Sequence, residues 1–370
     1  MVQIVSIPNY RWQQFPSRLR RLPGSLEQVE LMVFEPAIGR FDWGERKWRH
    51  PREGRRLDKR VTLFTLPCSV SVAEDYETRA PGECKRIGSF IRSAIAQYGW
   101  EEPLLWCSSP ACAGFYQDIP HSGLVYDCDR SWDGLVPDEW EAALCDGADV
   151  VFAASPLLEE QLSPVCHNLA LVPNGFDDAL FAQSGGDGLR IPHDLAAIPH
   201  PTLGMLGSCG RETNLAPLIY AAKAQPDWSF VLVGGVSRYA RGYDALAPLP
   251  NVHVLGEKSY VSLPHYLGHF DVCLSLSGSE AEESVLPEAF YAYLQTGKPI
   301  VTLTAGPELD QYADVVYPAH FDIEFLDACR RALTETGETL PRTRRDYARE
   351  ASWSERLAQC HRILHGTALL

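Results

Sequence analysis

The sequence lacks the features that mark membrane-spanning, secreted, metal-binding or nucleic-acid-binding proteins. It has no run of 18 or more apolar residues, which argues against a transmembrane helix. Its N-terminus lacks the charged-then-apolar order of a signal peptide, so we expect a cytoplasmic protein. The 11 cysteines include no C-x-x-C pair, so we expect reduced thiols, no metal and no cofactor. A net charge of -15 argues against general nucleic-acid binding.

One segment is basic although the whole chain is acidic. Residues 11–60 hold thirteen Lys and Arg against seven Asp and Glu, interspersed with tryptophans such as Trp12 and Trp43. Such a segment could rest on the anionic inner face of the plasma membrane or hold a phosphate-bearing acceptor. A solvated, charge-mixed surface explains the same residues, and both interpretations stay open.

Length and the alternation of strands with helices predict two domains. At 370 residues the chain exceeds what one hydrophobic core usually serves. Short apolar strands alternate with helical segments in residues 1–182, and a second series of the same kind fills residues 201–350. Residues 183–200 are rich in Gly, Pro and polar types, as in a linker, and we expect the helix in residues 351–370 to return to the first domain. The predicted fold class is α/β, with two Rossmann-like doubly wound domains facing a central cleft.

Two small-residue turns stand out on physical grounds. Asn174-Gly175 follows a strand, and both residue types tolerate positive φ, so Asp177 can then accept hydrogen bonds from neighbouring amides. Gly207, Ser208 and Gly210 follow another strand and precede a helix, where backbone amides and the helix dipole favour a diphosphate. Either turn could equally be structural.

The order of several motifs resembles glycosyltransferases of the GT-B architecture, both the large family-four type and bacterial teichuronic-acid and polysaccharide enzymes. The segments that carry this resemblance are VPNGFD at 172–177, GMLGSCGRE at 204–212, NVHVLGE at 251–257, TGKPIV at 296–301, LVYDCDRSW at 124–132 and ADVVFAASPLL at 148–158. The resemblance implies a nucleotide-sugar donor held in the second domain. It also implies that Arg211 stabilises the leaving diphosphate without a divalent metal, and that the base contacts the strand of His253 and Val254, through the backbone of Val254 and Leu255 in particular.

The sequence departs from this family where the donor's ribose and sugar would be held. Relatives carry a glutamate five residues before the glycine of G-K-P and a second acid eight residues earlier, but Ala292 and Ser284 stand there. Glu280 and Glu288 keep the spacing about one helical turn earlier, and Pro287 suits a first helical turn. Glu288 either replaces the ribose ligand or merely complements the helix dipole, and we leave both interpretations open.

The acceptor side is expected in the first domain. An inverting transfer needs a base for the acceptor hydroxyl, and Asp127 and Asp129 directly follow a strand; we favour Asp127 of the two. Trp132 could stack on a sugar, although both acids could instead cap the loop. The loop after the first strand borders the acceptor pocket in enzymes of this architecture, so we name Arg11, Trp12 and Arg18 as acceptor-binding candidates.

The sequence therefore predicts a glycosyltransferase that moves a sugar from a nucleotide diphosphate to a hydroxyl of a glycan or lipid-linked acceptor, in bacterial surface-polysaccharide synthesis. Two rivals remain. The loss of both acids, at Ser284 and Ala292, favours a catalytically silent glycosyltransferase-like subunit that binds a partner protein. A nucleotide-sugar epimerase of the same architecture would need no acceptor.

Overall fold

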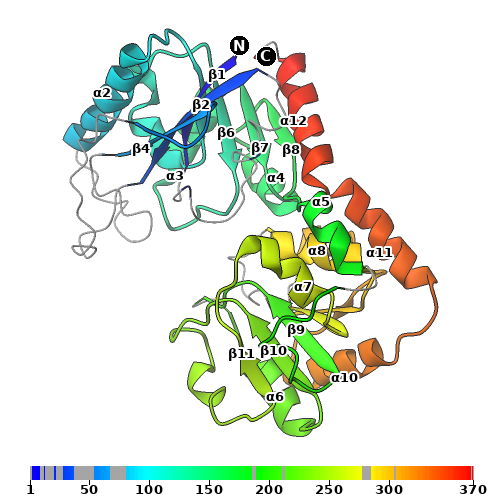
Figure 1. Cartoon of the computed structure of the whole chain (residues 1–370). Coiled ribbons are helices and arrows are strands. Elements are labelled where there is room, and N and C mark those ends of the chain that lie inside the picture. The colour runs from blue at the N-terminus through cyan, green and yellow to red at the C-terminus, as the bar shows by residue number, and fades with distance from the viewer. Residues whose placement is uncertain are drawn as a thin grey trace. The chain divides into compact units, whose positions relative to one another are not determined.

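A computed structural model describes residues 2–8, 12, 21, 28–36, 54–66, 81–185, 189–210, 213–276, 285–303, 306–367 and 369. The chain divides into two compact units. Unit 1 comprises residues 1–173 and 357–370, and unit 2 comprises residues 174–356. Figure 1 shows both units, coloured along the chain.

Unit 1 is built on a sheet of eight described strands in the order β3-β4-β2-β1-β5-β6-β7-β8. All neighbouring strands run parallel except β3, which is antiparallel to β4. The strands are β1 (Val2–Ile7), β2 (Val29–Glu35), β3 (Arg55–Arg56), β4 (Val61–Thr65), β5 (Leu104–Cys107), β6 (Gly123–Cys128), β7 (Val150–Ala153) and β8 (Leu169–Leu171). The strand order reverses between β1 and β5, which makes the carboxyl ends of these strands the expected ligand edge.

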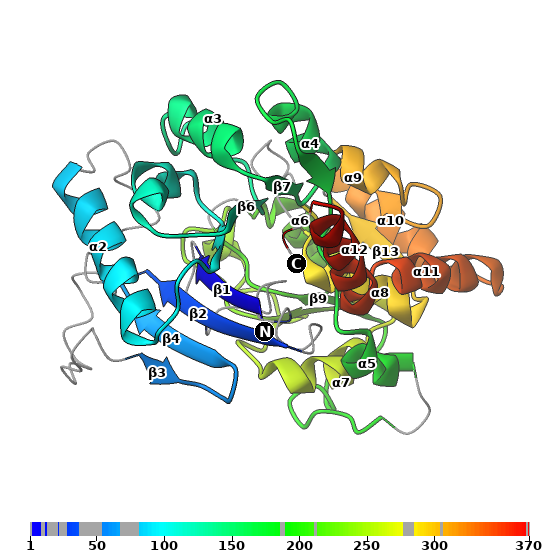
Figure 2. The same ribbon diagram turned by 90° about the horizontal axis from the view of Figure 1, so that it is seen from above.

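Helices cover both faces of this sheet. They are α2 (Pro81–Gln97), α3 (Asp138–Gly147), α4 (Pro156–Leu162) and α12 (Trp353–Gly366). Figure 2 shows α2 and α3 along one side of the sheet and α12 on the other. Leu357, Cys360 and Leu364 of α12 are buried in the same apolar cluster as Ile4 and Trp106. The last helix is thus part of the first unit from Leu357 onward.

Unit 2 is built on a parallel sheet of six described strands in the order β11-β10-β9-β12-β13-β14. Counted from β9, this is the 3-2-1-4-5-6 order of a dinucleotide-binding sheet, with its switch point between β9 and β12. The strands are β9 (Thr202–Leu206), β10 (Ser229–Val233), β11 (Val252–Val254), β12 (Val272–Ser275), β13 (Ile300–Thr302) and β14 (Tyr317–Pro318).

The helices of unit 2 bury one apolar cluster on each face of the sheet. They are α5 (Asp178–Phe181), α6 (Ala216–Ala224), α7 (Leu263–Leu267), α8 (Glu288–Thr296), α9 (Pro307–Asp310), α10 (Asp322–Leu333) and α11 (Thr339–Glu350). Residues of α6 and α10 line one cluster, and residues of α7, α8 and α11 line the other.

The division between the units falls earlier in the chain than the linker expected at residues 183–200. Unit 2 begins at Asn174, and Phe176, Phe181 and Leu195 are all buried in the apolar cluster of α8. Leu195 therefore anchors the Gly- and Pro-rich stretch to the second unit, which composition alone does not reveal.

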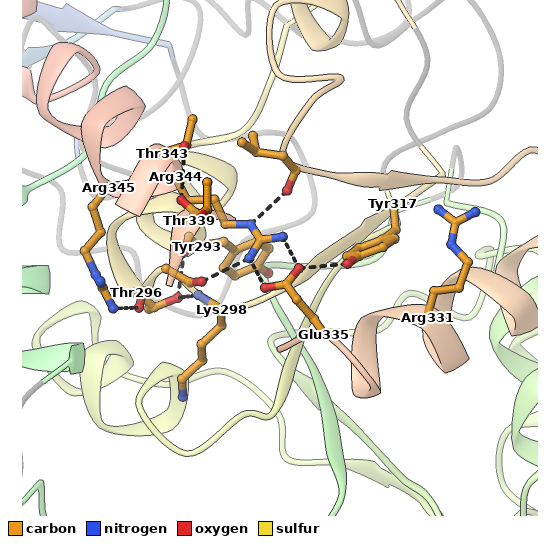
Figure 3. A network of polar contacts seen from close by, with 12 residues as sticks. Tyr293, Thr296, Lys298, Tyr317, Arg331, Glu335, Thr339, Thr343, Arg344 and Arg345 are labelled. Carbon is orange, nitrogen blue, oxygen red and sulfur yellow. Dashed lines mark hydrogen bonds and ion pairs between the residues drawn. The ribbon is translucent and has the colours of Figure 1, made fainter. Parts of the chain in front are cut away.

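Helix α11 packs through a buried cation. Its fully buried side chains are Ala348 and Arg344. The guanidinium of Arg344 contacts both carboxylate oxygens of Glu335 at 2.5 and 2.6 Å. Arg344 also donates to the backbone oxygens of Val315 at 2.8 Å and Gly297 at 3.1 Å, and Tyr317 donates to Glu335 at 2.8 Å. Figure 3 shows this network. Leu340, Tyr347 and Ala348 of the same helix pack against the apolar cluster of α8, so α11 is held by apolar contacts as well as by the buried ion pair.

The G-K-P motif is a structural turn in unit 2. Gly297 ends α8 in the left-handed conformation, at φ +74°, which favours glycine. The Lys298 ammonium donates to the backbone oxygens of Leu267, Gly268 and Phe270 at 2.6 to 3.1 Å, so it caps the end of α7. Burial lowers the pKa of Lys298, while these three acceptors compensate its charge.

We predict that Arg344→Met lowers the free energy of unfolding by about 3–5 kcal/mol, because it leaves the Glu335 carboxylate buried without its cation. Arg349→Met, on the same helix, removes an exposed ion pair with Asp346 and should change stability little. Chemical denaturation of both variants measures the difference. Equal losses for the two variants would contradict the role given to Arg344.

Candidate functional site

The loops after β9 and β10 pack backbone to backbone at the carboxyl edge of unit 2. The amide of Gly207 donates to Val233 O at 3.0 Å, and the amide of Cys209 donates to Gly235 O at 2.8 Å. Gly207 has φ +120° and Gly234 has φ +151°. A Cβ on Gly234 would lie 2.1 Å from Gly207 O, so only glycine allows this approach.

The loop of Gly207, Ser208 and Gly210 offers fewer amides than the sequence suggests. The amide of Gly210 donates to Thr213 Oγ1 at 3.0 Å, whereas that of Ser208 makes no hydrogen bond to any described residue. Helix α6 begins only at Ala216, so the loop does not run directly into a helix N-terminus. Arg211 lies outside the described residues. Among the described amides at 207–210, that of Ser208 is therefore the one not committed to another group of the protein.

Strand β11 is the edge of the sheet and leaves backbone groups exposed. The amide of Phe230 donates to Asn251 O, and the amide of Leu255 donates to Leu232 O. In a strand, the backbone N–H and C=O of alternate residues point to the same neighbouring strand. Those of Asn251 and Leu255 point to β10, so the N–H and C=O of Val254 point away from it. The side chain of Val254 is exposed, and partial burial lowers the pKa of His253. The amide of Leu255 is committed to the sheet, which leaves Val254 as the residue that presents its backbone outward.

Glu288 is the first residue of α8, directly after Pro287, and it lies at the carboxyl edge. It accepts a hydrogen bond of 2.5 Å from the hydroxyl of Tyr260, which follows β11. The Glu288 carboxylate is thus bound to the segment that follows β11. Its position at the first turn also complements the helix dipole, so the structure fits both interpretations of Glu288.

The crossover motif fastens the start of α8. The side-chain amide of Asn174 donates from Nδ2 to Leu286 O at 3.2 Å, and Leu286 N donates to Glu308 at 2.7 Å. Glu308 also accepts a hydrogen bond from Tyr291. Asp177 accepts from Leu180 N at 3.0 Å and caps α5, which confirms the amide contact expected of it. The Asn174 side chain therefore holds the backbone two residues before Glu288.

Ala292, which stands where the resemblance places a ribose-binding acid, lies in the hydrophobic core. Ala292 is fully buried in the apolar cluster of α8. Position 292 therefore faces the interior in this chain, one turn beyond Glu288. Ser284 and Glu280 lie outside the described residues.

The two acids of unit 1 lie in different environments. Asp127, in β6, is 3% exposed and accepts a hydrogen bond of 3.2 Å from the indole of Trp106. Asp129 follows the strand, keeps 25% of its side chain exposed and contacts Arg130 at 3.3 Å. Of the two carboxylates, that of Asp129 is the one open to an incoming hydroxyl.

The predicted aromatic contacts are more enclosed than expected. Trp132 is 3% exposed, with the Arg130 guanidinium 5.9 Å from its ring centre, so little of the ring is available to stack on a sugar. The backbone of Trp12 donates to Glu35 at 3.2 Å, and Thr65 donates to the same carboxylate at 3.1 Å. Arg11 and Arg18 lie outside the described residues.

Three residues that make polar contacts in the structure, Glu35, Tyr260 and Tyr293, were not predicted from the sequence. Glu35 ends an apolar strand, and that change from apolar to acidic was a usable signal. Tyr260 and Tyr293 gave no such signal, because an aromatic residue in a strand-and-helix pattern reads as core.

The described residues contain no group of three or more His, Cys, Asp and Glu side chains arranged to hold a metal ion. In the same part of the chain, every helix is too short or too polar to cross a membrane.

Comparisons with known proteins identify the fold. No protein family and no curated sequence matches the chain. Sucrose-phosphate synthase from Thermosynechococcus elongatus has a TM-score of 0.74 at 15% identity, over 100% of both chains. The α,α-trehalose-phosphate synthase (UDP-forming) from Burkholderia vietnamiensis has a TM-score of 0.73 at 14% identity, over 97% of this chain and 96% of that one. Anabaena HepE in complex with UDP and glucose has a TM-score of 0.68 at 14% identity, over 99% and 100%.

These likenesses confirm the predicted GT-B fold, with its two Rossmann-like domains. The resemblance to teichuronic-acid glycosyltransferases is more specific than a shared fold, and it stays a prediction.

We predict that Gly234→Ala disrupts the paired loops and lowers the free energy of unfolding by about 2–4 kcal/mol, from the positive φ and the collision with Gly207 O. Gly235→Ala is the matched control, since a Cβ there meets its nearest atom at an ordinary 3.4 Å. Thermal unfolding of both variants checks this. A tolerated Gly234→Ala would contradict the close approach of the two loops.

Proposed function

We propose that this protein is a glycosyltransferase that uses a UDP-sugar donor. The observation that carries the proposal is that unit 2 supplies the Gly207 loop after β9, the outward backbone of Val254 in β11 and the Glu288 carboxylate at the start of α8, on a sheet with the strand order of a dinucleotide-binding domain. Support for uridine comes from the fold neighbours, of which HepE was solved with UDP and with UDP-glucose.

Each part of the donor has a matching group. The Ser208 amide and Arg211 suit the diphosphate, which carries the negative charge that leaves with the nucleotide. The outward N–H and C=O of Val254 form an adjacent donor and acceptor, which matches the N3–H and neighbouring carbonyl of uracil. Glu288 suits the ribose hydroxyls, with Tyr260 holding its carboxylate. The charge of the diphosphate is then met by protein groups, without a divalent metal.

The acceptor half of the reaction belongs to unit 1. The acceptor oxygen bonds to the anomeric carbon as the bond from that carbon to the diphosphate breaks, and the hydroxyl proton passes to a carboxylate. The exposure of Asp129 makes it the better candidate for this base than Asp127, whose carboxylate binds the Trp106 indole. We propose a glycan or lipid-linked glycan as the acceptor, in surface-polysaccharide synthesis, with the basic segment of residues 11–60 resting on an anionic membrane.

A catalytically silent subunit is the second candidate, because Ala292 replaces an acid of the donor site and is enclosed in the core. Such a subunit would keep its cellular role when Asp129 and Arg211 are both changed to Ala. An epimerase would instead convert its UDP-sugar in a reaction without acceptor.

We predict that UDP stabilises the protein more than GDP, ADP, dTDP or CMP in a thermal-shift assay. A ligand at a hundred times its dissociation constant adds about 2.7 kcal/mol to the free energy of unfolding. If no nucleotide shifts the transition, the donor site is not functional and the silent-subunit candidate replaces the enzyme.

Glu288→Gln tests the ribose contact. We expect it to weaken UDP binding roughly tenfold, as for the loss of one charge-assisted hydrogen bond. The control is Glu324→Gln, which also removes an acid from the first turn of a helix, α10. If both variants bind UDP as the wild type does, Glu288 only complements the helix dipole.

Asp129→Asn should lower the turnover of UDP-glucose by about 10²- to 10⁴-fold and leave UDP affinity unchanged, because it removes only the base. UDP release is measured with a panel of sugars, sugar phosphates and lipid-linked sugars as acceptors. Asp127→Asn is compared in the same assay. Loss of turnover in Asp127→Asn alone would assign the base to Asp127.

A further inference from the structure

A tyrosine of α8 holds the strand that leads into the Gly207 loop. Tyr293 is 1% exposed, and its hydroxyl accepts a hydrogen bond of 2.7 Å from Leu206 N. The same hydroxyl lies 3.3 Å from Leu206 O, to which it donates. Burial raises the pKa of Tyr293, so the phenol stays protonated and serves as acceptor and donor together.

The sheet cannot supply these two hydrogen bonds itself. The backbone groups of alternate residues in a strand point to opposite neighbouring strands. Gly207 N donates to β10, whereas Thr202 O accepts from Asp271 N, just before β12. The backbone N–H and C=O of Leu206, an even-numbered residue like Thr202, therefore point toward β12. The pairing of β9 with β12 ends at Gly204 and Cys273. Beyond that point the backbone of Leu206 needs another partner, because an unpaired buried amide is costly. The hydroxyl of Tyr293 takes the place of the missing strand.

The helix that carries Tyr293 is itself fixed at both ends. Leu286, just before α8, is held by Asn174 and Glu308. At the other end Arg344 binds Gly297 O, and the Thr296 hydroxyl donates to Tyr293 O, as the network in Figure 3 shows. Tyr293 therefore holds the backbone of Leu206 from a helix that is fixed at both ends. The next residue, Gly207, begins the loop with φ +120°.

We propose that Tyr293 is a positioning residue for donor binding, which ties the diphosphate loop at Gly207 to the helix that begins with Glu288. This role rests on the proposed function. One rigid helix then sets the separation between the loop for the diphosphate and the carboxylate for the ribose. Tyr293 itself does not touch the donor.

The test compares Tyr293→Phe with Tyr266→Phe. Both substitutions remove the phenol hydrogen bond of a buried tyrosine in unit 2, but the partner of Tyr266, on α7, is Asp194, and neither residue belongs to the proposed donor site. We expect Tyr293→Phe to weaken UDP binding roughly tenfold, the usual scale for a buried amide left unpaired, and Tyr266→Phe to bind UDP within about twofold of the wild type. With UDP-glucose, the KM for the donor should rise in Tyr293→Phe, with kcat nearly unchanged at saturation.

Amide hydrogen exchange gives a second readout that needs no nucleotide. Exchange at residues 206–210 should become faster in Tyr293→Phe and stay at the wild-type rate in Tyr266→Phe. Equal exchange or equal UDP affinity in the two variants would overturn the role of Tyr293 while the proposed function stands. A wild-type protein that binds no nucleotide would overturn the proposed function, and the positioning role with it.

Discussion

The arrangement of unit 2 depends on one buried cation. The guanidinium of Arg344 is fully enclosed, and it is compensated by the Glu335 carboxylate and by two backbone oxygens. A buried charge is tolerated only when its partners are complete, so the elements that supply those partners are fixed with respect to one another. They are the end of α8, the segment before β14 and the segment after α10. Because Gly297 is one of the partners, the position of α8 follows from this ion pair.

From α8 the constraint extends to the carboxyl edge of the sheet. Glu288 stands at one end of the helix, and Tyr293, in its second half, reaches the last residue of β9. The contact of Gly234 with Gly207 then fixes the loop after β9 against the loop after β10. The groups proposed for the ribose and the diphosphate are thus positioned by backbone contacts and one helix, and few of them depend on long flexible side chains. A site built in this way is preorganised, which favours binding because little ordering remains to be done.

The loss of the usual acid at Ala292 has a structural counterpart. Position 292 lies among apolar side chains of the core, where an ionised carboxylate without a partner would be costly. Glu288 lies one turn earlier, at the exposed start of the helix, with Tyr260 as its partner. In unit 1 the same reasoning separates Asp127, whose carboxylate supports a buried indole, from Asp129, which remains partly open. Burial therefore distinguishes acids that sequence spacing treats as equivalent.

The sequence by itself determined the two parallel sheets, because apolar strands alternating with amphipathic helices have few other ways to bury their surfaces. It also located the glycine turn at Gly207, since small residues after a strand carry a local signal. Only the tertiary structure decided which side chains form hydrogen bonds with the backbone of that turn. The role of Arg344 was missed because a charged residue is not expected in a core, and the support from Tyr293 was missed because its partner is 87 residues away. Periodicity records which residues are apolar, whereas a buried polar contact depends on two distant segments meeting, and that information exists only once the chain has folded.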